Sequence, residues 1–284
     1  MNEVNIEAWV EAAPDGQQGF REAVHIILDS IGHSQNLQAK MVMKGGLLMA
    51  IRYDSSRYTR DLDFSTTDLY IAEDADALLA EFEAGLATAA ERLPYGTACQ
   101  LQSRKIEPKG ENKTHHSLTL TVGYVDKSNP RAMARLRAQN ATQVVQIDYS
   151  FNEAVFAVEL LELDGGATIH SYSLHNILAE KMRSLLQQPI RRRNRRQDVY
   201  DIWLLLEDGS EFNTEDLTKI HTMLVDSCLS KNISPTIDSI IDEKVIAMAR
   251  EGYVNLKDDV EGELPAFDDA MRRVEKLYRS LPWA

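Results

Sequence analysis

The spacing of hydrophobic and polar residues predicts helices and strands together in the first part of the chain. Apolar residues at helical spacing predict helices over residues 16–33, 47–53 and 73–92. Alternating or β-branched runs predict strands over residues 41–43, 61–65, 98–107, 116–126, 142–149, 155–163 and 168–170. A segment that mixes both elements in this order is typical of an α+β domain built on a mixed sheet.

The pattern changes to helices alone from Ser173 onward. An apolar stripe runs from Leu174 to Leu186, and Ser173 is a suitable N-cap for that helix. Further helices are expected over residues 197–208, 214–229, 236–250 and 266–281. We therefore predict an α+β fold with a mixed-sheet domain over residues 1–166 and a C-terminal helical domain over residues 167–284.

The charge of the chain limits the partners that it can bind. The formal net charge is −13, which opposes general affinity for nucleic acids because that affinity comes from neutralising phosphates. One dense basic stretch, residues 191–196 (RRRNRR), offers a local site for a polynucleotide or a triphosphate. A solvated linker between two helices is the alternative interpretation of the same residues.

Several features favour a cytoplasmic protein without a membrane partner. No apolar run approaches the roughly 18–20 residues that cross a bilayer, and the N-terminus lacks the basic and apolar regions of a signal peptide. Cys99 and Cys228 are too few for a disulfide framework, and neither belongs to a Cys-x-x-Cys pair. We expect both to be inert thiols.

A glycine pair marks the turn between a predicted strand and a predicted helix. Gly45 and Gly46 follow the strand at residues 41–43, so their backbone amides can approach a phosphate closely. Alone, such a pair is more often an ordinary turn. Whether this glycine pair marks a phosphate site depends on the residues that follow it.

Two carboxylates follow on the next predicted strand. Asp61 and Asp63 occupy positions i and i+2, which places them side by side on one face. They repel each other unless a cation lies between them, and such hard oxygen ligands suit Mg²⁺, or Mn²⁺, together with substrate phosphates. A solvent-facing acidic pair is the alternative.

A third carboxylate would complete a site for two metal ions. Asp148 lies in the apolar run at residues 144–150, and it would join the first pair if the two strands are neighbours. Asp126, which ends another strand-like run, is the competing candidate. Three carboxylates can hold the ions that activate the attacking oxygen and neutralise the leaving group in phosphoryl transfer.

These residues resemble the AbiEii/AbiGii-type toxins within the polymerase-beta-like nucleotidyltransferase superfamily. That family has Lys-Gly-Gly, a helix, and then Arg-x-Ser/Thr-x-Asp-Leu-Asp-Phe. The present chain has Lys44-Gly45-Gly46 followed by Arg57-Tyr58-Thr59-Arg60-Asp61-Leu62-Asp63-Phe64. The family often has Ser or Thr after the glycines where this chain has Leu47, so backbone amides remain as the phosphate contacts of this turn.

A second match lies in the helical part, and the resemblance spans roughly residues 40–208. The family has Ala-Glu-Lys and then an arginine-rich link into Asp-x-Tyr-Asp, and this chain has Ala179-Glu180-Lys181 and Arg195-Arg196-Gln197-Asp198-Val199-Tyr200-Asp201. Lys181 falls on the apolar stripe of its helix, so its charge needs an anionic partner. That partner could be a nucleotide phosphate or Asp198.

The resemblance implies a polymerase-beta-like core that transfers a nucleoside monophosphate from an NTP to an acceptor hydroxyl. It implies Mg²⁺ as cofactor, an acceptor that is RNA such as tRNA or a protein, and the role of toxin in an abortive-infection-type toxin–antitoxin pair with a cognate antitoxin. The implied metal ligands are Asp61, Asp63 and Asp148, which are catalytic together with Lys181. The implied nucleotide-binding residues are Lys44, Gly45, Gly46, Arg57, Arg60, Asp198 and Asp201.

Two other classes of function fit parts of the same pattern. A metal-dependent nuclease could use the three acids with water as nucleophile, and it would need no NTP. A catalytically silent nucleotide-binding module could keep the fold, although it would have no need to keep the repulsive pair Asp61 and Asp63.

Overall fold

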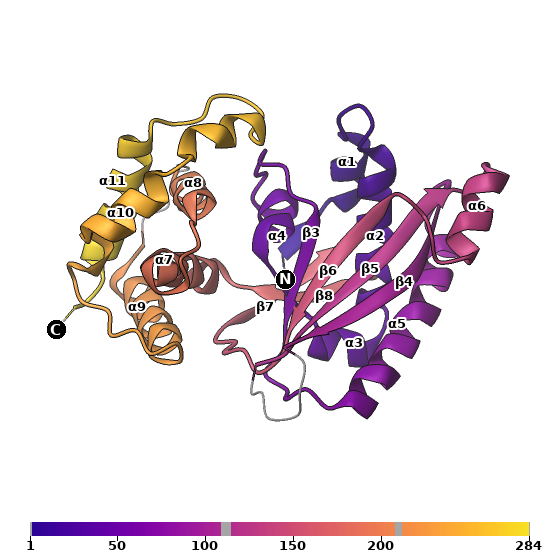
Figure 1. The fold of residues 1–284 in the computed structure, drawn as a ribbon, viewed down its shortest axis with the longest axis horizontal. Helices are drawn as coiled ribbons and strands as arrows, with labels where there is room; N and C mark the ends of the chain where they lie inside the picture. The colour runs from indigo at the N-terminus through magenta and orange to yellow at the C-terminus, as the bar shows by residue number, and fades with distance from the viewer. Residues whose placement is uncertain (1, 109–114, 208–211, 284) are drawn as a thin grey trace. The chain divides into compact units, whose positions relative to one another are not determined.

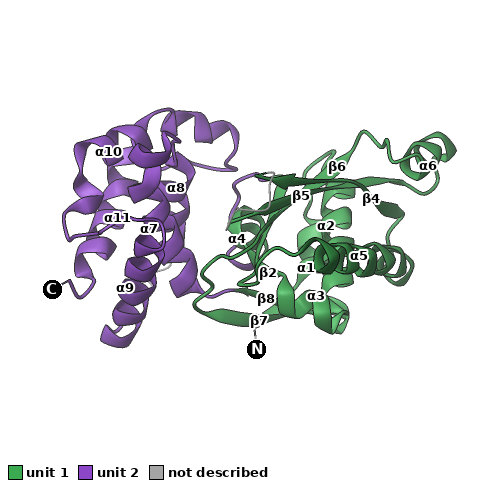
Figure 2. Ribbon diagram, turned by 60° about the horizontal axis from the view of Figure 1, so that its bottom comes forward, with its two compact units in different colours: residues 1–51, 60–171 green, residues 52–59, 172–284 purple. Residues whose placement is uncertain are grey.

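The computed structural model describes residues 2–108, 115–207 and 212–283, which form two compact units. Unit 1 contains residues 1–51 and 60–171, and unit 2 contains residues 52–59 and 172–284 (Figure 2). The chain therefore leaves unit 1 after Ile51, contributes a short segment to unit 2, and returns to unit 1 at Arg60. Each unit is described separately below.

Unit 1 is built on an eight-stranded mixed sheet with the strand order β1-β7-β8-β2-β3-β6-β5-β4 (Figure 1). The strands are β1 (Asn2–Val4), β2 (Val42–Lys44), β3 (Asp61–Ser65), β4 (Thr97–Glu107), β5 (Ser117–Asp126), β6 (Val144–Ser150), β7 (Val158–Leu163) and β8 (Thr168–Tyr172). At its centre, β3 pairs with β2 in an antiparallel and with β6 in a parallel arrangement. These three strands carry the residues that the sequence singles out.

One face of the central strands is buried and the other is polar. Leu62 and Phe64 of β3 and Ile147 of β6 are fully buried. The alternate residues of the same strands, such as Asp63 and Asp148, are partly accessible. Because side chains alternate between faces along a strand, the carboxylates are directed away from this core.

Helices α2 and α5 pack on each other and against the strands β4 and β5 (Figure 1). Unit 1 contains α1 (Ile6–Glu11), α2 (Gln18–Gly32), α3 (Gln35–Lys40), α5 (Ala72–Arg92), α6 (Pro130–Arg137) and most of α4 (Gly45–Arg52). In α2, Val24, Ile27 and Leu28 are fully buried, as the apolar spacing predicts. The helix α6 packs over β5 through Leu136.

Unit 2 is helical. Its helices are α7 (Leu174–Arg191), α8 (Arg196–Leu205), α9 (Thr214–Leu229), α10 (Glu243–Arg250) and α11 (Phe267–Ser280), with 3₁₀ turns η2 (Ser239–Ile241) and η3 (Tyr253–Asp258). The central helix α7 contacts α8, α9 and α10. The hydroxyl of Ser173 accepts a hydrogen bond from the backbone N–H of Asn176, so the predicted N-cap is confirmed.

The predicted α+β class, with a mixed sheet followed by helices, is confirmed. The elements β1, α1 and α3 were not predicted because each is too short for a clear period, and α6 was missed because Leu136 is its one buried residue. The helix predicted over residues 236–250 is wrong in its first half. Asp242 interrupts it, since its side chain accepts hydrogen bonds from the N–H groups of Lys244 and Val245 and so caps a new helix.

The predicted domain boundary at residue 166 differs from the division seen between residues 171 and 172. The reason is β8, which is inserted between β7 and β2 near the middle of the sheet and therefore belongs to unit 1. The segment at residues 52–59 is a second difference, because the sequence gives no sign that it contacts the helical unit. Within residues 2–108, 115–207 and 212–283, no helix is both long and apolar enough to cross a membrane.

Candidate active site

The glycine turn lies directly against a predicted metal ligand. Gly45 has a φ of 77°, a left-handed conformation, and it begins α4 where β2 ends. Lys44 pairs with Asp63 across the β2–β3 ladder. A Cβ atom on Gly45 would collide with the Asp63 carboxylate, whose Cγ would lie only 2.7 Å away. The turn therefore needs glycine for its backbone conformation and for the space that Asp63 occupies.

The substitution Gly45→Ala is expected to lower nucleotidyl transfer at least about 10-fold and to destabilise the protein by about 1 kcal/mol or more, because alanine is strained at positive φ. The added methyl group would also displace the Asp63 carboxylate. Gly96→Ala is the control, since its Cβ would meet nothing within 4 Å and its φ is not positive. Thermal unfolding and a transfer assay measure the two effects. Equal activity of the two variants would contradict the tight packing inferred at Gly45.

The three predicted metal ligands share one face of the sheet. Asp61 and Asp63 are two residues apart on β3, and Asp63 is the direct partner of Asp148 in the parallel β3–β6 ladder. Directly opposed residues of neighbouring strands point to the same side of a sheet. The structure thus places Asp61, Asp63 and Asp148 on one face of two neighbouring strands, as the sequence predicts if the strands are neighbours.

The competing candidate Asp126 lies elsewhere on the sheet. Thr119 of β5 is the direct partner of Asp148, and Asp126 follows seven residues later at the exposed end of β5. At about 3.4 Å per residue, this separation is roughly 24 Å along the strand. Hydrogen bonds from Ser128 lower the pKa of the Asp126 carboxyl, and Asp126 pairs with Thr97 at the far end of the ladder.

Thr119 is a site residue that the sequence analysis missed. Its hydroxyl donates a hydrogen bond of 2.9 Å to Oδ1 of Asp148. This bond fixes the orientation of the carboxylate and leaves Oδ2 for another contact. The strand pattern of residues 116–126 could have placed Thr119 on a polar face, but its partner depends on the β5–β6 register.

The electrostatics of the carboxylates fit a cation. Partial desolvation, followed by the negative charge of Asp148, raises the pKa of the exposed Asp61, and the neighbouring Arg60 opposes this rise. In the described part of the chain, no three His, Cys, Asp or Glu side chains converge as a ready-made metal centre. Mg²⁺ usually binds through one or two carboxylates and completes its shell with water and substrate phosphates. The carboxylate oxygens of Asp61, Asp63 and Asp148 are of the type that such an ion binds, and metal binding here stays a prediction.

A second cluster of predicted site residues lies in unit 2 and is almost completely buried. Arg57 donates two hydrogen bonds to Asp201, of 3.0 Å to Oδ1 and 3.1 Å to Oδ2. Nζ of Lys181 lies 2.5 Å from Oδ2 of Asp201 and 3.3 Å from Oδ1 of Asp198. Lys181 therefore has both aspartates as anionic partners, where the sequence left open a phosphate or Asp198.

The charges in this cluster stabilise one another. Burial alone would lower the pKa of Lys181, but Asp201 and Asp198 outweigh it and raise that pKa. Burial alone would raise the pKa of Asp201, but Lys181 and Arg57 outweigh it and lower that pKa. Both carboxylate oxygens of Asp201 are engaged, which gives this residue an anchoring role. Its contact with a nucleotide stays a prediction.

Asp198 differs from Asp201 in one respect. Its Oδ2 atom is buried and has no hydrogen-bond partner within the described residues. Oδ2 of Asp198 is therefore the carboxylate oxygen of this cluster that remains available to accept a hydrogen bond. The nucleotide contacts predicted for Asp198 and Arg57, and the catalytic role predicted for Lys181, stay predictions.

The remaining predicted nucleotide-binding residues flank the carboxylates of unit 1. Lys44 is the last residue of β2, and Gly46 lies in the first turn of α4. Arg60 directly precedes Asp61 and is close enough to influence its pKa. These positions are consistent with a phosphate site beside Asp61 and Asp63, as the motif predicts.

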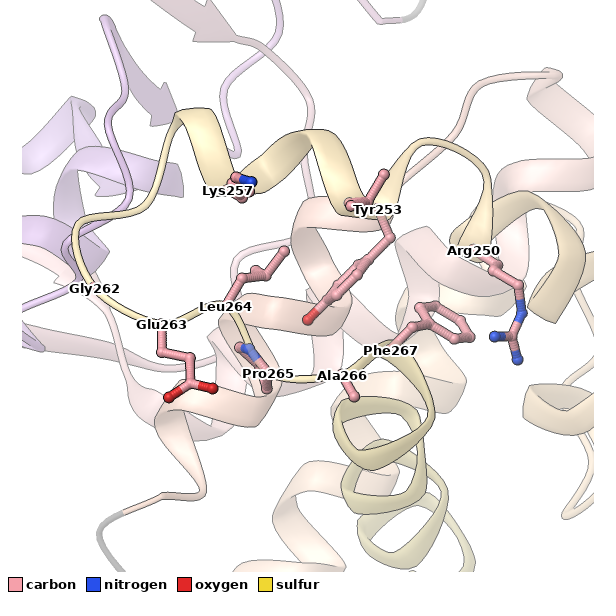
Figure 3. Close-up of a pocket in the computed structure, with 10 residues that line it drawn as sticks. Arg250, Tyr253, Lys257, Gly262, Glu263, Leu264, Pro265, Ala266 and Phe267 are labelled. Atoms are coloured by element: carbon pink, nitrogen blue, oxygen red, sulfur yellow. The ribbon is translucent and has the colours of Figure 1, made fainter.

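A separate hollow of about 630 Å³ lies within unit 2 between η3 and the start of α11 (Figure 3). The ring of Tyr253 meets Phe267 edge to face, and the guanidinium of Arg250 lies 4.3 Å from the centre of the Phe267 ring. None of the predicted site residues lines this hollow. We assign it no part in the reaction.

The mixed sheet, the glycine turn and the carboxylates on β3 and β6 match what the resemblance to a nucleotidyltransferase implies. The sequence matches the family "Nucleotidyl transferase AbiEii toxin, Type IV TA system" over residues 27–273. The chain therefore belongs to the AbiEii nucleotidyltransferase toxin family, and the predicted resemblance is confirmed. No curated protein gives a significant match.

Two solved structures are similar to this chain. The chain is similar to MenT4, a nucleotidyltransferase toxin from Mycobacterium tuberculosis, with a TM-score of 0.52 and 16% identity over 95% of this chain and 87% of that one. It is also similar to JHP933 from Helicobacter pylori, with a TM-score of 0.44 and 13% identity over 95% of this chain and 93% of that one. At these identities the likeness to MenT4 concerns the fold.

Proposed function

We propose that this toxin nucleotidyltransferase moves a nucleoside monophosphate from an NTP to an acceptor hydroxyl and releases pyrophosphate, with Mg²⁺ or Mn²⁺ as cofactor. The observation that carries the proposal is the placement of Asp63 directly opposite Asp148 and beside Gly45. Carboxylates on one face and a glycine turn next to them are what phosphoryl transfer with metal ions needs.

The residues of unit 1 have distinct roles in this proposal. Asp61 and Asp63 hold the cation or cations, and Asp148 contributes a third carboxylate. The bound metal would supply neutralisation of the charge that develops on the phosphates. The backbone amides of Gly45 and Gly46 seat the triphosphate, and Lys44 and Arg60 add positive charge beside it.

The bond changes follow from this arrangement. The acceptor oxygen forms a bond to the α-phosphorus while the bond from that phosphorus to the pyrophosphate oxygen breaks. The hydroxyl proton passes to the carboxylate of Asp148, whose Oδ2 is left available because Thr119 bonds Oδ1. A role of Lys181 in neutralising the leaving pyrophosphate stays a prediction of the sequence motif.

The acceptor that we propose is RNA such as tRNA, with a protein hydroxyl as the alternative. Membership of a toxin family of type IV toxin–antitoxin systems supports an abortive-infection role and a cognate antitoxin. The NTP is the second substrate in either case.

The test is incubation of the purified protein with each α-³²P-labelled NTP, Mg²⁺ and total cellular RNA, beside the Asp61→Ala, Asp63→Ala double variant. We expect the wild type to place label on RNA or on protein. The double variant should transfer no label, and neither should the wild type in the presence of the chelator EDTA. Added Mn²⁺ should restore transfer by the chelated wild type. Label that survives EDTA would contradict the metal dependence. No label with any NTP, together with RNA shortened only by the wild type, would replace transfer by nuclease activity.

A further inference from the structure

Three consecutive arginines at the end of α7 form an exposed basic surface. Arg191 is the last residue of α7, and Arg192 and Arg193 follow before α8 begins. All three are exposed, and none forms an ion pair or hydrogen bond within the described residues. We call residues 191–193 the arginine loop.

The arginine loop is held in place from both sides. The backbone N–H of Arg195 donates a hydrogen bond of 2.7 Å to the side chain of Gln188, which is buried. The side chain of Asn194 donates a hydrogen bond of 2.8 Å to Glu251. Arg192 has a left-handed backbone with a φ of 51°. The loop therefore presents its three guanidinium groups from an anchored backbone.

Other exposed arginines of unit 2 are paired with acids. Arg250 pairs with Asp268, Arg272 with Asp269, and Arg279 with Asp238. The whole chain has 44 acidic and 31 basic residues, so acids are in surplus. Within the described residues, the three adjacent arginines of the arginine loop have no acidic partner despite this surplus.

The helix dipole does not account for the whole arginine loop. A cation in the last turn of α7 stabilises the carbonyl end of that helix, and Arg191 serves this purpose. Arg192 and Arg193 lie beyond the last turn, where the effect falls off. Arg192 ends α7 in a left-handed conformation, as helices often do, so the exposed charges of Arg192 and Arg193 are what needs another explanation.

We propose that the arginine loop binds the phosphate backbone of an RNA. Guanidinium groups match phosphate oxygens in pairs of parallel hydrogen bonds, and they also stack on unpaired bases. Ile190, which is 61% exposed next to the arginines, adds an apolar contact for a ribose or a base. The inference deepens the proposed function, on which it rests for the idea of an RNA acceptor.

The number of phosphate contacts predicts how strongly the affinity for RNA depends on the salt concentration. Each phosphate contact contributes a slope of about −0.7 to −0.9 to the plot of log affinity against log salt concentration. Three contacts therefore give a slope of about −2 to −3. Carboxylates of an acidic protein also pair with guanidinium forks, so we favour RNA because its unpaired bases can in addition stack on arginine and on the exposed Ile190.

The experiment measures fluorescence anisotropy of labelled bulk tRNA at several salt concentrations, with a triple variant in which Arg191, Arg192 and Arg193 become alanine. The matched control replaces three other exposed cations of unit 2 with alanine, namely Lys219, Arg272 and Lys276. Both variants change the net charge equally. We expect the arginine-loop variant to bind at least about 10-fold more weakly and to lose about 2 to 3 from the salt slope, while the control changes little.

Three outcomes would overturn the proposal: unchanged tRNA binding by the arginine-loop variant, equal losses in both variants, or displacement of tRNA by polyaspartate of the same charge as readily as by unlabelled tRNA. The last result would indicate a surface for acidic proteins. Thermal unfolding of both variants checks that they fold. A wild type that binds tRNA through the loop but transfers no label would leave this inference standing and contradict the proposed function.

Discussion

Replacement of Asp148 by asparagine is expected to lower the rate of nucleotidyl transfer at least about 10³-fold, because metal-assisted charge stabilisation contributes several kcal/mol and about 1.4 kcal/mol corresponds to a factor of ten. Asparagine keeps the shape of the side chain and an oxygen that can accept the hydrogen bond from Thr119. It removes the negative charge that the cation and the acceptor proton need. Single-turnover transfer with an α-labelled NTP measures the effect.

The control for this prediction is Asp126→Asn. Asp126 ends a strand of the same sheet, but it is exposed and belongs to the far end of the β4–β5 ladder. We expect its transfer rate to stay within about twofold of the wild type, as for surface substitutions away from a site. A large loss at Asp126 with a small loss at Asp148 would reverse the assignment of the third carboxylate.

The difference between Asp148 and Asp126 marks what the sequence alone can predict. That Asp61 and Asp63 share a face follows from the alternation of side chains along one strand, which is local. Which third acid joins them depends on the pairing of β3 with β6, and the two strands are separated by two helices and two strands of sequence. The sequence therefore favours Asp148 but keeps Asp126 as the competing candidate.

The buried cluster of unit 2 shows the same limit. The apolar stripe predicted that Lys181 points inward and needs an anion. The strongest contact of Lys181 is with Asp201, and Arg57 reaches the same carboxylate from 144 residues away in sequence. Such a contact between distant segments leaves no periodic signal, so the motif predicted the residues without predicting how they pair.

The short elements were missed for a different reason. Strand β1 has three residues and helices α1 and α3 have six each, so none of them completes two periods of its pattern. Their positions are fixed by pairing and packing, as when β1 joins β7 in parallel at the edge of the sheet.

Replacement of Asp201 by asparagine is expected to destabilise unit 2 by about 3–5 kcal/mol, because removing one partner of a buried ion pair leaves an uncompensated charge. Asp201 is fully buried, and its loss would leave Arg57 without this carboxylate and Lys181 with Asp198 alone. Urea unfolding followed by tryptophan fluorescence measures the change, since Trp203 lies on the same helix.

The contribution of Asp201 to the free energy of unfolding is expected to decrease in acid. The pKa of Asp201 is lowered in the folded state, so its contribution to stability is fully present above the unfolded value of about 3.9 and is lost as the pH falls through the folded value. The difference in unfolding free energy between the wild type and Asp201→Asn should therefore stay constant above about pH 5 and shrink in stronger acid.

The matched control is Asp268→Asn, which breaks the exposed pair with Arg250 and is expected to leave the urea midpoint almost unchanged. Equal midpoints for the wild type, Asp201→Asn and Asp268→Asn would contradict the anchoring role. If Asp201→Asn also loses affinity for NTP while it keeps wild-type stability, Asp201 acts through the nucleotide, as the sequence motif predicts. A loss of stability at unchanged NTP affinity would instead show that Asp201 anchors the fold of unit 2 without contacting the nucleotide.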